Sequence, residues 1–266
     1  MSRRRARGVE SALRQAGADL GSASKSLAAA GYIDEAVLLS VPGLLGWAEV
    51  RGPRLLSPVC RAYPQRWRER LGDVAPPVLW VRGEVPSGPW IGVVGGRSVP
   101  PSAERFAADC GEAVARLGTA MVSGGAVGCD SCAADGARAA NGAFVRILPC
   151  ALSEVPATDG CDLALAAPGE GFSTANAMER NVLIYASAEG TVVVQARLRQ
   201  GGTWHGAVGA LRRRLGVIMV RDLEDPAHRA LVALGGRQLS SPGDIAEVLA
   251  AGPIQPSFLA GPAFAG

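Results

Sequence analysis

Two stretches, WIGVVGGRS at residues 90–98 and TAMVSGGAVGCD at residues 119–130, decide the fold that this sequence predicts. Each begins with a short apolar run and ends in glycines, a pattern typical of a buried strand followed by a tight turn. A helix is expected between them, with Ser102 as a plausible cap and Gly118 at its end. Its apolar positions recur at helical spacing: Phe106, Cys110, Val114 and Leu117.

The order of strand, turn and helix continues toward the C-terminus. Further strands are predicted at 144–148, 162–166, 191–195 and 217–220, and further helices at 130–140, 176–186 and 204–215. Such alternation indicates an α/β fold: an extended Rossmann-like parallel sheet with helices on both faces.

The chain before this repeat has a different character. Alanine-rich stretches with small-residue breaks predict a small helical N-terminal domain at residues 1–72, in which 66–70 is a solvated helical face. Pro76-Pro77 marks the change, because two prolines cannot continue a helix. We therefore expect the Rossmann-like domain at 73–251 and a flexible tail at 252–266.

Composition places the chain among globular proteins. Of its 266 residues, 48% are hydrophobic and 19% are charged, and the net charge is +3. A basic face can exist within so small a total charge. No apolar run of signal-peptide or membrane-spanning length follows the basic residues 1–7, which favours a cytoplasmic protein without membrane contact. The six cysteines are scattered, and we expect them to be free thiols.

Four segments that follow predicted strands or open helices suit an anion. Parallel α/β sheets bind ligands beyond the carboxyl ends of their strands. Glycine permits close backbone approach, amides at a helix N-terminus favour negative charge, and arginine adds a fork of donors. The predicted phosphate-binding residues are Gly95, Gly96 and Arg97; Ser123, Gly124, Gly125, Gly128 and Asp130; Arg180 and Asn181; and Arg197, Arg199, Gly201, Gly202 and Thr203. Asp130 is also placed to cap the next helix, and each segment alone is compatible with a purely structural turn.

No pattern indicates catalysis, a metal or a bound cofactor. The glycines after the first strand lack the G-x-G-x-x-G spacing of dinucleotide-binding proteins. Cys129 and Cys132 form a C-x-x-C, but His205 and His228 do not stand at zinc-ligand spacing and are expected on helix surfaces. Ser123 lacks the context of a nucleophile elbow.

Several segments, in order along the chain, resemble the bacterial DNA-processing protein family, DprA or Smf. They are Tyr63-Pro64, PVLWVRG at 77–83, VVGGR at 93–97, SGGAVGCD at 123–130, Arg180-Asn181, Gly201-Gly202-Thr203 and the run from 228 to 245. The resemblance spans roughly residues 63–249. It implies an extended Rossmann-like fold, a homodimer, single-stranded DNA bound in a positive pocket, and transfer of that DNA to a RecA-type recombinase, with no enzymatic activity.

The sequence departs from the family at four positions. The family usually has arginine at the positions of Val127 and Val182, isoleucine at that of Cys129 and an acidic residue at that of Gln195. Each missing arginine removes a charge-assisted phosphate contact worth about 1–3 kcal/mol. The resemblance therefore implies either weaker DNA binding or a pocket adapted to another anion, such as a nucleotide.

Two other functions stay open at this stage. The same architecture resembles cytokinin-activating phosphoribohydrolases and related nucleotide-binding proteins, whose catalytic members carry P-G-G-x-G-T-x-x-E. The segment from Gln200 to Gly206 preserves only part of that motif and lacks its glutamate. A purely structural module is the third possibility, but it leaves four anion-compatible segments unexplained.

Overall fold

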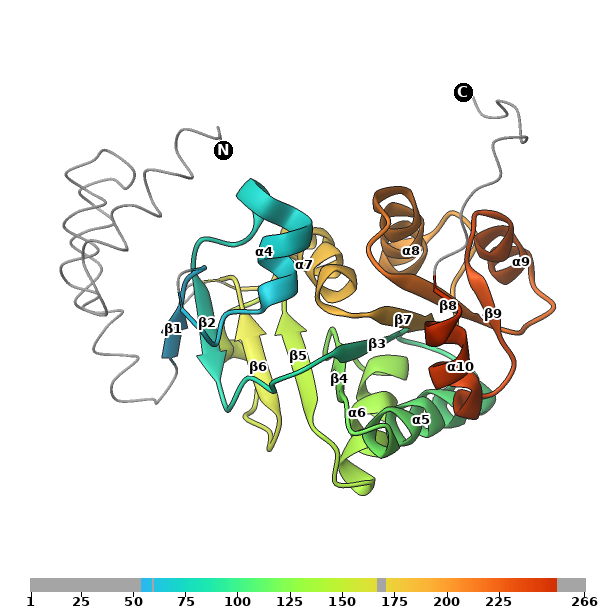
Figure 1. The fold of residues 1–266 in the computed structure, drawn as a ribbon, viewed down its shortest axis with the longest axis horizontal. Coiled ribbons are helices and arrows are strands. Elements are labelled where there is room, and N and C mark those ends of the chain that lie inside the picture. Colours follow the sequence, from blue (N-terminus) through green and yellow to red (C-terminus); the bar gives the residue numbers. More distant parts are fainter. Residues whose placement is uncertain (1–53, 59, 167–170, 253–266) are drawn as a thin grey trace.

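The computed structural model describes residues 54–58, 60–166 and 171–252. These residues form a nine-stranded sheet in the order β1-β2-β6-β5-β4-β3-β7-β8-β9 (Figure 1). The strands are β1 (Arg54–Leu56), β2 (Leu79–Arg82), β3 (Trp90–Val94), β4 (Ala120–Ser123), β5 (Phe144–Leu148), β6 (Cys161–Ala164), β7 (Gly190–Val193), β8 (Val217–Arg221) and β9 (Arg237–Leu239).

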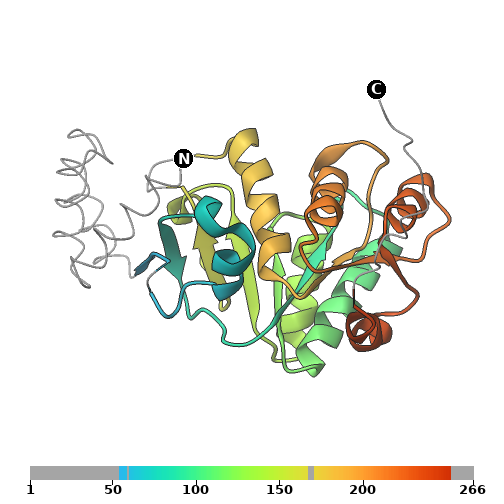
Figure 2. The same ribbon diagram turned by 45° about the horizontal axis from the view of Figure 1, so that its top comes forward.

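Helices cover both faces of the sheet (Figures 1 and 2). They are α4 (Gln65–Leu71), α5 (Pro101–Arg116), α6 (Cys129–Ala139), α7 (Thr174–Ser187), α8 (Gly201–Arg213), α9 (Pro226–Ala233) and α10 (Ile245–Ala250). Three short 3-10 turns complete the elements: η1 (Gly72–Val74), η2 (Leu152–Glu154) and η3 (Pro242–Asp244). Helices α4, α7, α8 and α9 bury apolar residues in one core, whereas α5, α6 and α10 do so in the core on the opposite face.

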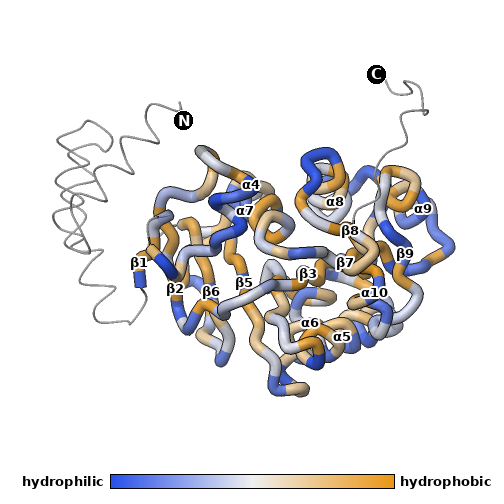
Figure 3. Tube along the Cα trace, in the orientation of Figure 1, coloured by the Kyte–Doolittle hydropathy of each residue, from blue (hydrophilic) through white to orange (hydrophobic). Residues whose placement is uncertain are grey.

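The predicted fold class is confirmed, with one addition. Strands β3 to β9 pair in parallel, but β1 and β2 pair antiparallel to each other, and β2 pairs antiparallel to β6. These two strands precede the repeat of strand and helix, so no crossover helix imposes a parallel direction on them. The strands β5, β6 and β8 are mostly hydrophobic along their length, as strands covered on both faces should be (Figure 3).

Strand β3 is the point where the winding of the sheet reverses. It pairs with β4 on one side and with β7 on the other, and the chain adds further strands outward in both directions. The connections that leave the carboxyl ends of β3 and β7 therefore diverge to opposite faces of the sheet, through α5 and α8. Parallel α/β sheets bind ligands in the crevice that opens at this point.

Strand β1 is part of the sheet, and helix α4 packs against α7 rather than standing apart. The indole Nε1 of Trp67, a fully buried residue of α4, donates a hydrogen bond of 2.9 Å to the carbonyl of Leu183 in α7. The Arg70 guanidinium donates to the carbonyls of Tyr185 and Ala186 near the end of α7, each at 3.3 Å. The prediction that residues 66–70 form a solvated helical face is therefore only partly correct. Arg68 and Glu69 are exposed, but Trp67 is buried. The rest of the predicted helical domain, 1–53, and the tail from 253 onward lie outside the described residues.

One predicted cap is wrong. Helix α5 begins at Pro101, so Ser102 lies within its first turn and caps nothing. Proline is suited to that start, because its fixed φ matches a helix and its missing N–H needs no partner there. Among the described residues, no helix is both long enough and apolar enough to cross a bilayer.

Candidate functional site

A groove of about 620 Å³ opens beyond the carboxyl ends of β3 and β7, and all four predicted segments contribute to it. Nine of the fifteen predicted residues line it: Gly95, Gly96, Arg97, Asp130, Arg180, Asn181, Arg197, Gly202 and Thr203. We call it the anion groove. The convergence follows from the topology, because the carboxyl ends of parallel strands meet at one edge of the sheet.

Two arginines supply the accessible charge of the anion groove. Arg97 follows β3 and Arg197 follows β7, and both side chains are exposed. The Arg97 guanidinium also stands 6.0 Å from the ring centroid of Phe172, an exposed residue just before α7. Within the described part of the chain, neither arginine is held in an ion pair. Both guanidinium groups are therefore available to an anion.

The N-terminus of α8 adds backbone donors to the same groove. The helix begins at Gly201 without a side-chain cap, so its first amides have no side-chain acceptor. The Thr203 hydroxyl donates a hydrogen bond of 2.9 Å to the carbonyl of Gly95 and thereby joins this helix start to the loop after β3. The helix dipole and free amides of a first turn favour negative charge at such a place.

Arg180 lines the anion groove but is held by the protein. It is only 5% exposed, and its Nη1 donates to the carbonyls of Gly124 and, at 2.8 Å, Ile147. Burial lowers the pKa of its guanidinium and raises the pKa of the neighbouring Asp130 carboxyl, while the attraction between the two charges opposes both shifts. The main role of Arg180 is therefore structural: it links α7 to the loop after β4.

Asp130 does not cap α6, contrary to the prediction. The helix begins one residue earlier, at Cys129, and the Asp130 carboxylate reaches back into the loop. It accepts hydrogen bonds from the amides of Gly124 at 3.2 Å and Ala126 at 3.4 Å. A Cβ at position 124 would lie 2.8 Å from this carboxylate and would collide with the Arg180 guanidinium, so the loop requires glycine there.

The other residues predicted in this loop shape it and do not line the groove. The Ser123 hydroxyl points inward and donates to the carbonyl of Val93 at 2.7 Å. Gly125 and Gly128 have φ of +69° and +87°, values that favour glycine. A Cβ at Gly128 would also lie 2.5 Å from the Arg97 carbonyl oxygen, so the close contact between the two loops depends on it.

Two predicted residues of the fourth segment also lie outside the anion groove. Arg199 is exposed, with φ of 57°, and Gly201 lines a neighbouring groove between α7 and α8. Conversely, Phe172, Met178 and Tyr185 line the anion groove without having been predicted. Phe172 and Met178 are 57% and 59% exposed. Their presence in a polar stretch before and within α7 was the available signal, but apolar side chains are normally expected in a core.

Cys129 of the C-x-x-C and one histidine are buried, whereas Cys132 is half-buried. Burial raises the pKa of the Cys129 thiol to about 12, the opposite of what a redox-active C-x-x-C needs. His228 is 1% exposed, so its predicted surface position is wrong; its Nδ1 contacts Asp225 Oδ2 at 2.5 Å. His205 is exposed, as predicted. Across residues 54–252, where described, no three His, Cys, Asp or Glu side chains cluster as metal ligands do.

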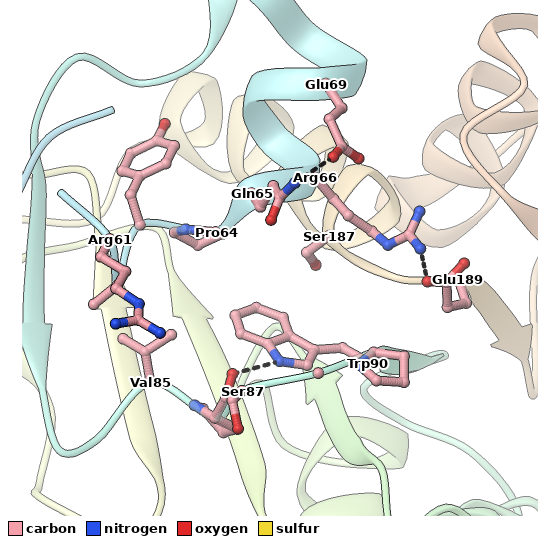
Figure 4. Close-up of a pocket in the computed structure, with 15 residues that line it drawn as sticks. Arg61, Pro64, Gln65, Arg66, Glu69, Val85, Ser87, Trp90, Ser187 and Glu189 are labelled. Carbon is pink, nitrogen blue, oxygen red and sulfur yellow. Dashed lines mark hydrogen bonds and ion pairs between the residues drawn. The ribbon is translucent and has the colours of Figure 1, made fainter. Parts of the chain in front are cut away.

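A second cavity, of about 790 Å³, lies around Trp90, at the amino end of β3 (Figure 4). Three of its four charged side chains have partners within the cavity: Arg66 pairs with Glu189, and Glu69 accepts a hydrogen bond of 2.8 Å from Gln65 Nε2. The Trp90 indole donates to the carbonyl of Pro86 at 3.1 Å. Although larger, this cavity is at the edge opposite the strand carboxyl ends and presents no glycine-rich helix start. The anion groove is the better candidate.

Comparisons with known proteins agree with this architecture. The structure is similar to DNA processing protein A from Streptococcus pneumoniae, with 18% identity, a TM-score of 0.71 and coverage of 92% of this chain and 93% of that one. DNA processing protein A from Helicobacter pylori matches at 17% identity and a TM-score of 0.63, covering 75% of this chain and 96% of that one. A molybdenum cofactor binding protein from Rippkaea orientalis matches at 24% identity and a TM-score of 0.51, covering 62% of this chain and 97% of that one.

At these identities the structural likenesses establish the fold alone. No curated protein sequence matches this chain significantly. The family model described as DNA recombination-mediator protein A, however, matches residues 54–249, which is most of the chain and includes every residue of the anion groove. The chain therefore belongs to the family of DNA recombination-mediator protein A, the DNA-processing proteins.

Proposed function

We propose that this protein binds single-stranded DNA in the anion groove, chiefly through the phosphate backbone. The observation that carries the proposal is the convergence of two exposed arginines, Arg97 and Arg197, with the uncapped start of α8 at the switch point of the sheet. Family membership supports the same ligand class, and the H. pylori relative binds single-stranded DNA.

The number of accessible charges sets the expected strength. Because Arg180 donates to backbone carbonyls, only Arg97 and Arg197 among the groove arginines are free for phosphates. Val127, in the loop after β4, is 70% exposed and adds no charge where the family resemblance led us to expect an arginine. We therefore expect modest affinity with a shallow salt dependence and little preference for sequence.

The proposal includes the biological role and the assembly that the family implies. In it the protein is a non-enzymatic homodimer that holds single-stranded DNA for loading of a RecA-type recombinase. Sedimentation analysis at several protein concentrations tests the dimer. Strand-exchange assays with the recombinase, with and without this protein, test the loading step.

The binding proposal is tested by fluorescence anisotropy at low salt. A labelled single-stranded oligonucleotide is titrated with the protein, and unlabelled single strands, duplexes and nucleoside monophosphates compete. We expect saturable binding that increases with oligonucleotide length and is displaced best by single strands. Absence of binding at low salt contradicts the proposal.

One observation favours a second candidate, a nucleotide site. The anion groove, at about 620 Å³, is within the range of small-molecule sites, about 300–1,000 Å³. Displacement of the oligonucleotide by a nucleoside monophosphate at equal or lower concentration favours this alternative, and release of free base would identify an enzyme.

A further inference from the structure

Thr203, in the first turn of α8, is one of the predicted phosphate-binding residues, yet its hydroxyl already has a partner within the protein. Thr203 Oγ1 donates a hydrogen bond of 2.9 Å to the carbonyl oxygen of Gly95, 108 positions earlier in the chain. A hydroxyl carries a single proton, so this group cannot keep that bond and also donate to a phosphate oxygen. The hydrogen bond itself, rather than contact with a phosphate, is therefore what Thr203 contributes to the anion groove.

The bond joins the two segments that carry the free cations of the anion groove. Gly95 stands two residues before Arg97, in the loop after β3. Arg197 stands six residues before Thr203, and the amide of Gln200 closes the turn between them with a hydrogen bond of 3.0 Å to the Arg197 carbonyl. The bond between Thr203 and Gly95 therefore fixes the loop of Arg97 against the turn of Arg197.

The loop of Arg97 is also held from the side of α6. A Cβ at Gly95 would overlap Sγ of Cys129, the first residue of α6, so the loop lies directly against that side chain. The amide of Cys129 donates to the carbonyl of Gly96 at 3.2 Å. Two consecutive carbonyls of the loop thus accept hydrogen bonds from the first turns of two different helices, α8 and α6. The loop can shift only if one of these bonds breaks.

The side chains of α7 contact the same turn of α8 through longer bonds. Asn181 Nδ2 donates to the carbonyl of Gly202, and the Tyr185 hydroxyl donates to the carbonyl of Thr203, each at 3.5 Å. These distances are long for a hydrogen bond. They also connect α8 to α7 and not to the loop after β3. Among the described residues, the Thr203 hydroxyl thus supplies the short polar link between α8 and the loop that carries Arg97.

We propose that Thr203 is a positioning residue of the anion groove and not a phosphate ligand. Its hydroxyl holds the loop of Arg97 where the guanidinium of that residue meets the same strand as Arg197. This inference rests on the proposed binding of single-stranded DNA and assigns a role within that site. Because the hydroxyl acts through Arg97, its loss should affect binding only while the Arg97 guanidinium is present.

The test separates the hydroxyl from the rest of the side chain. Thr203→Val replaces the hydroxyl with a methyl group and keeps the branched shape, whereas Thr203→Ser keeps the hydroxyl. Thr119→Val is the matched control, because Thr119 Oγ1 also donates to a backbone carbonyl, that of Val114, at 3.1 Å. Thr119 lies just before the amino end of β4, at the edge of the sheet opposite the anion groove.

Each of these substitutions is made alone and together with Arg97→Ala. Thermal unfolding first shows that each protein folds. A labelled single-stranded oligonucleotide is then titrated with each protein at low salt, and the dissociation constants are compared between the two backgrounds.

The expected result is a loss of affinity that depends on Arg97. When Arg97 is present, Thr203→Val should weaken binding about fivefold, the size of one net hydrogen bond, and Thr203→Ser and Thr119→Val less than about twofold. Thr203→Val and Thr119→Val should lower the unfolding temperature alike, since each removes one hydrogen bond, so stability does not account for the difference in binding. When Arg97→Ala is present, Thr203→Val should change the affinity by less than about twofold, because the group that it positions is gone.

Equal losses in the two backgrounds would overturn the inference, because Thr203 would then contact the phosphate independently of Arg97. A loss with Thr203→Ser as large as with Thr203→Val would show that the hydroxyl is not the group that matters. No loss with Thr203→Val would show that the bond to Gly95 is dispensable. Absence of binding by the unchanged protein would instead refute the DNA-binding proposal itself, and this inference with it.

Discussion

Arg180 Nη1 donates a hydrogen bond to the carbonyl oxygen of Gly124 and so joins helix α7 to the glycine-rich loop after β4. The two residues are 56 positions apart in the chain, and of the two Arg180 lines the anion groove. Asp130 stabilises the same loop from the other side through the amides of Gly124 and Ala126. The charged pair at the centre of the site therefore sets the shape of the groove, while the exposed arginines meet the ligand.

Replacing Arg180 should lower the stability of the fold rather than remove a charge that is available to a ligand. Arg180→Ala leaves the carboxylate of Asp130 buried without its neighbouring cation, and two buried carbonyls lose their donor. Loss of one partner from a buried charged pair lowers the free energy of unfolding by about 3–5 kcal/mol. Urea unfolding measures this, with the exposed Arg97→Ala as the control that should change stability by less than about 0.5 kcal/mol. Equal stability of the two variants would show that Arg180 is not a structural link.

A pair of glycine substitutions tests the packing of α5 on α6. A Cβ at Gly111 would overlap the carbonyl oxygen of Ala133, because the two helix backbones touch there. Gly111→Ala should therefore lower the free energy of unfolding by about 1–3 kcal/mol, as overpacking does. Gly209→Ala, also helical but beside empty space, should raise it by up to about 1 kcal/mol. If both substitutions changed the free energy of unfolding in the same direction, the close backbone contact of α5 with α6 at Gly111 would be contradicted.

Thiol reactivity tests the burial of the cysteines. Burial raises the pKa of Cys129 and of Cys161 to about 12, so at pH 8 almost none of either thiol is the reactive thiolate. At pH 8 the partly exposed Cys60 should therefore be labelled much faster than Cys129, whose thiol is buried and almost entirely protonated. Mass spectrometry after brief labelling of the native protein measures each site. Rapid labelling of Cys129 in the folded protein would be incompatible with this structure.

Truncation tests where the folded unit begins. Leu56, Tyr63 and Trp67 are buried in the core beneath α7, so a fragment that starts at residue 73 loses them. Removal of a buried tryptophan side chain alone costs about 3–5 kcal/mol. We expect a fragment of residues 54–252 to unfold cooperatively on heating and a fragment of residues 73–252 to lack a cooperative transition. Folding of the shorter fragment would instead support the boundary at residues 72 and 73 that the sequence suggested.

The sheet and the position of the site were predictable because both follow from a repeated local pattern. Apolar runs such as 90–94, followed by glycine and a helical pattern, specify parallel strands, and parallel strands bring Arg97, Arg197 and Gly202 to one edge. The reversal of winding at β3 opens a crevice at that edge of the sheet. No long-range contact had to be known for these conclusions.

The direction of individual side chains was not predictable. Ser123 at the end of β4, and Arg180 and His228 in helices, are polar residues, for which exposure is the usual outcome. All three are nevertheless buried against partners distant in sequence or within a cap. The antiparallel pairing of β2 with β6, onto which β1 adds, is encoded by no local pattern. Phe172 and Met178 were missed for the converse reason, since they are apolar and exposed.

The salt dependence of single-stranded DNA binding tests the central claim most directly. For single strands, the slope of the logarithm of the binding constant against the logarithm of salt concentration is about −0.7 for each neutralised phosphate. We predict that Arg97→Ala and Arg197→Ala together make this slope shallower by about 1.4 and weaken binding to all sequences alike. Arg116→Ala, at an exposed position on α5 where Arg116 pairs with Glu112, should leave the slope unchanged. An unchanged slope in the double variant, or no binding by the unchanged protein at low salt, would contradict the account.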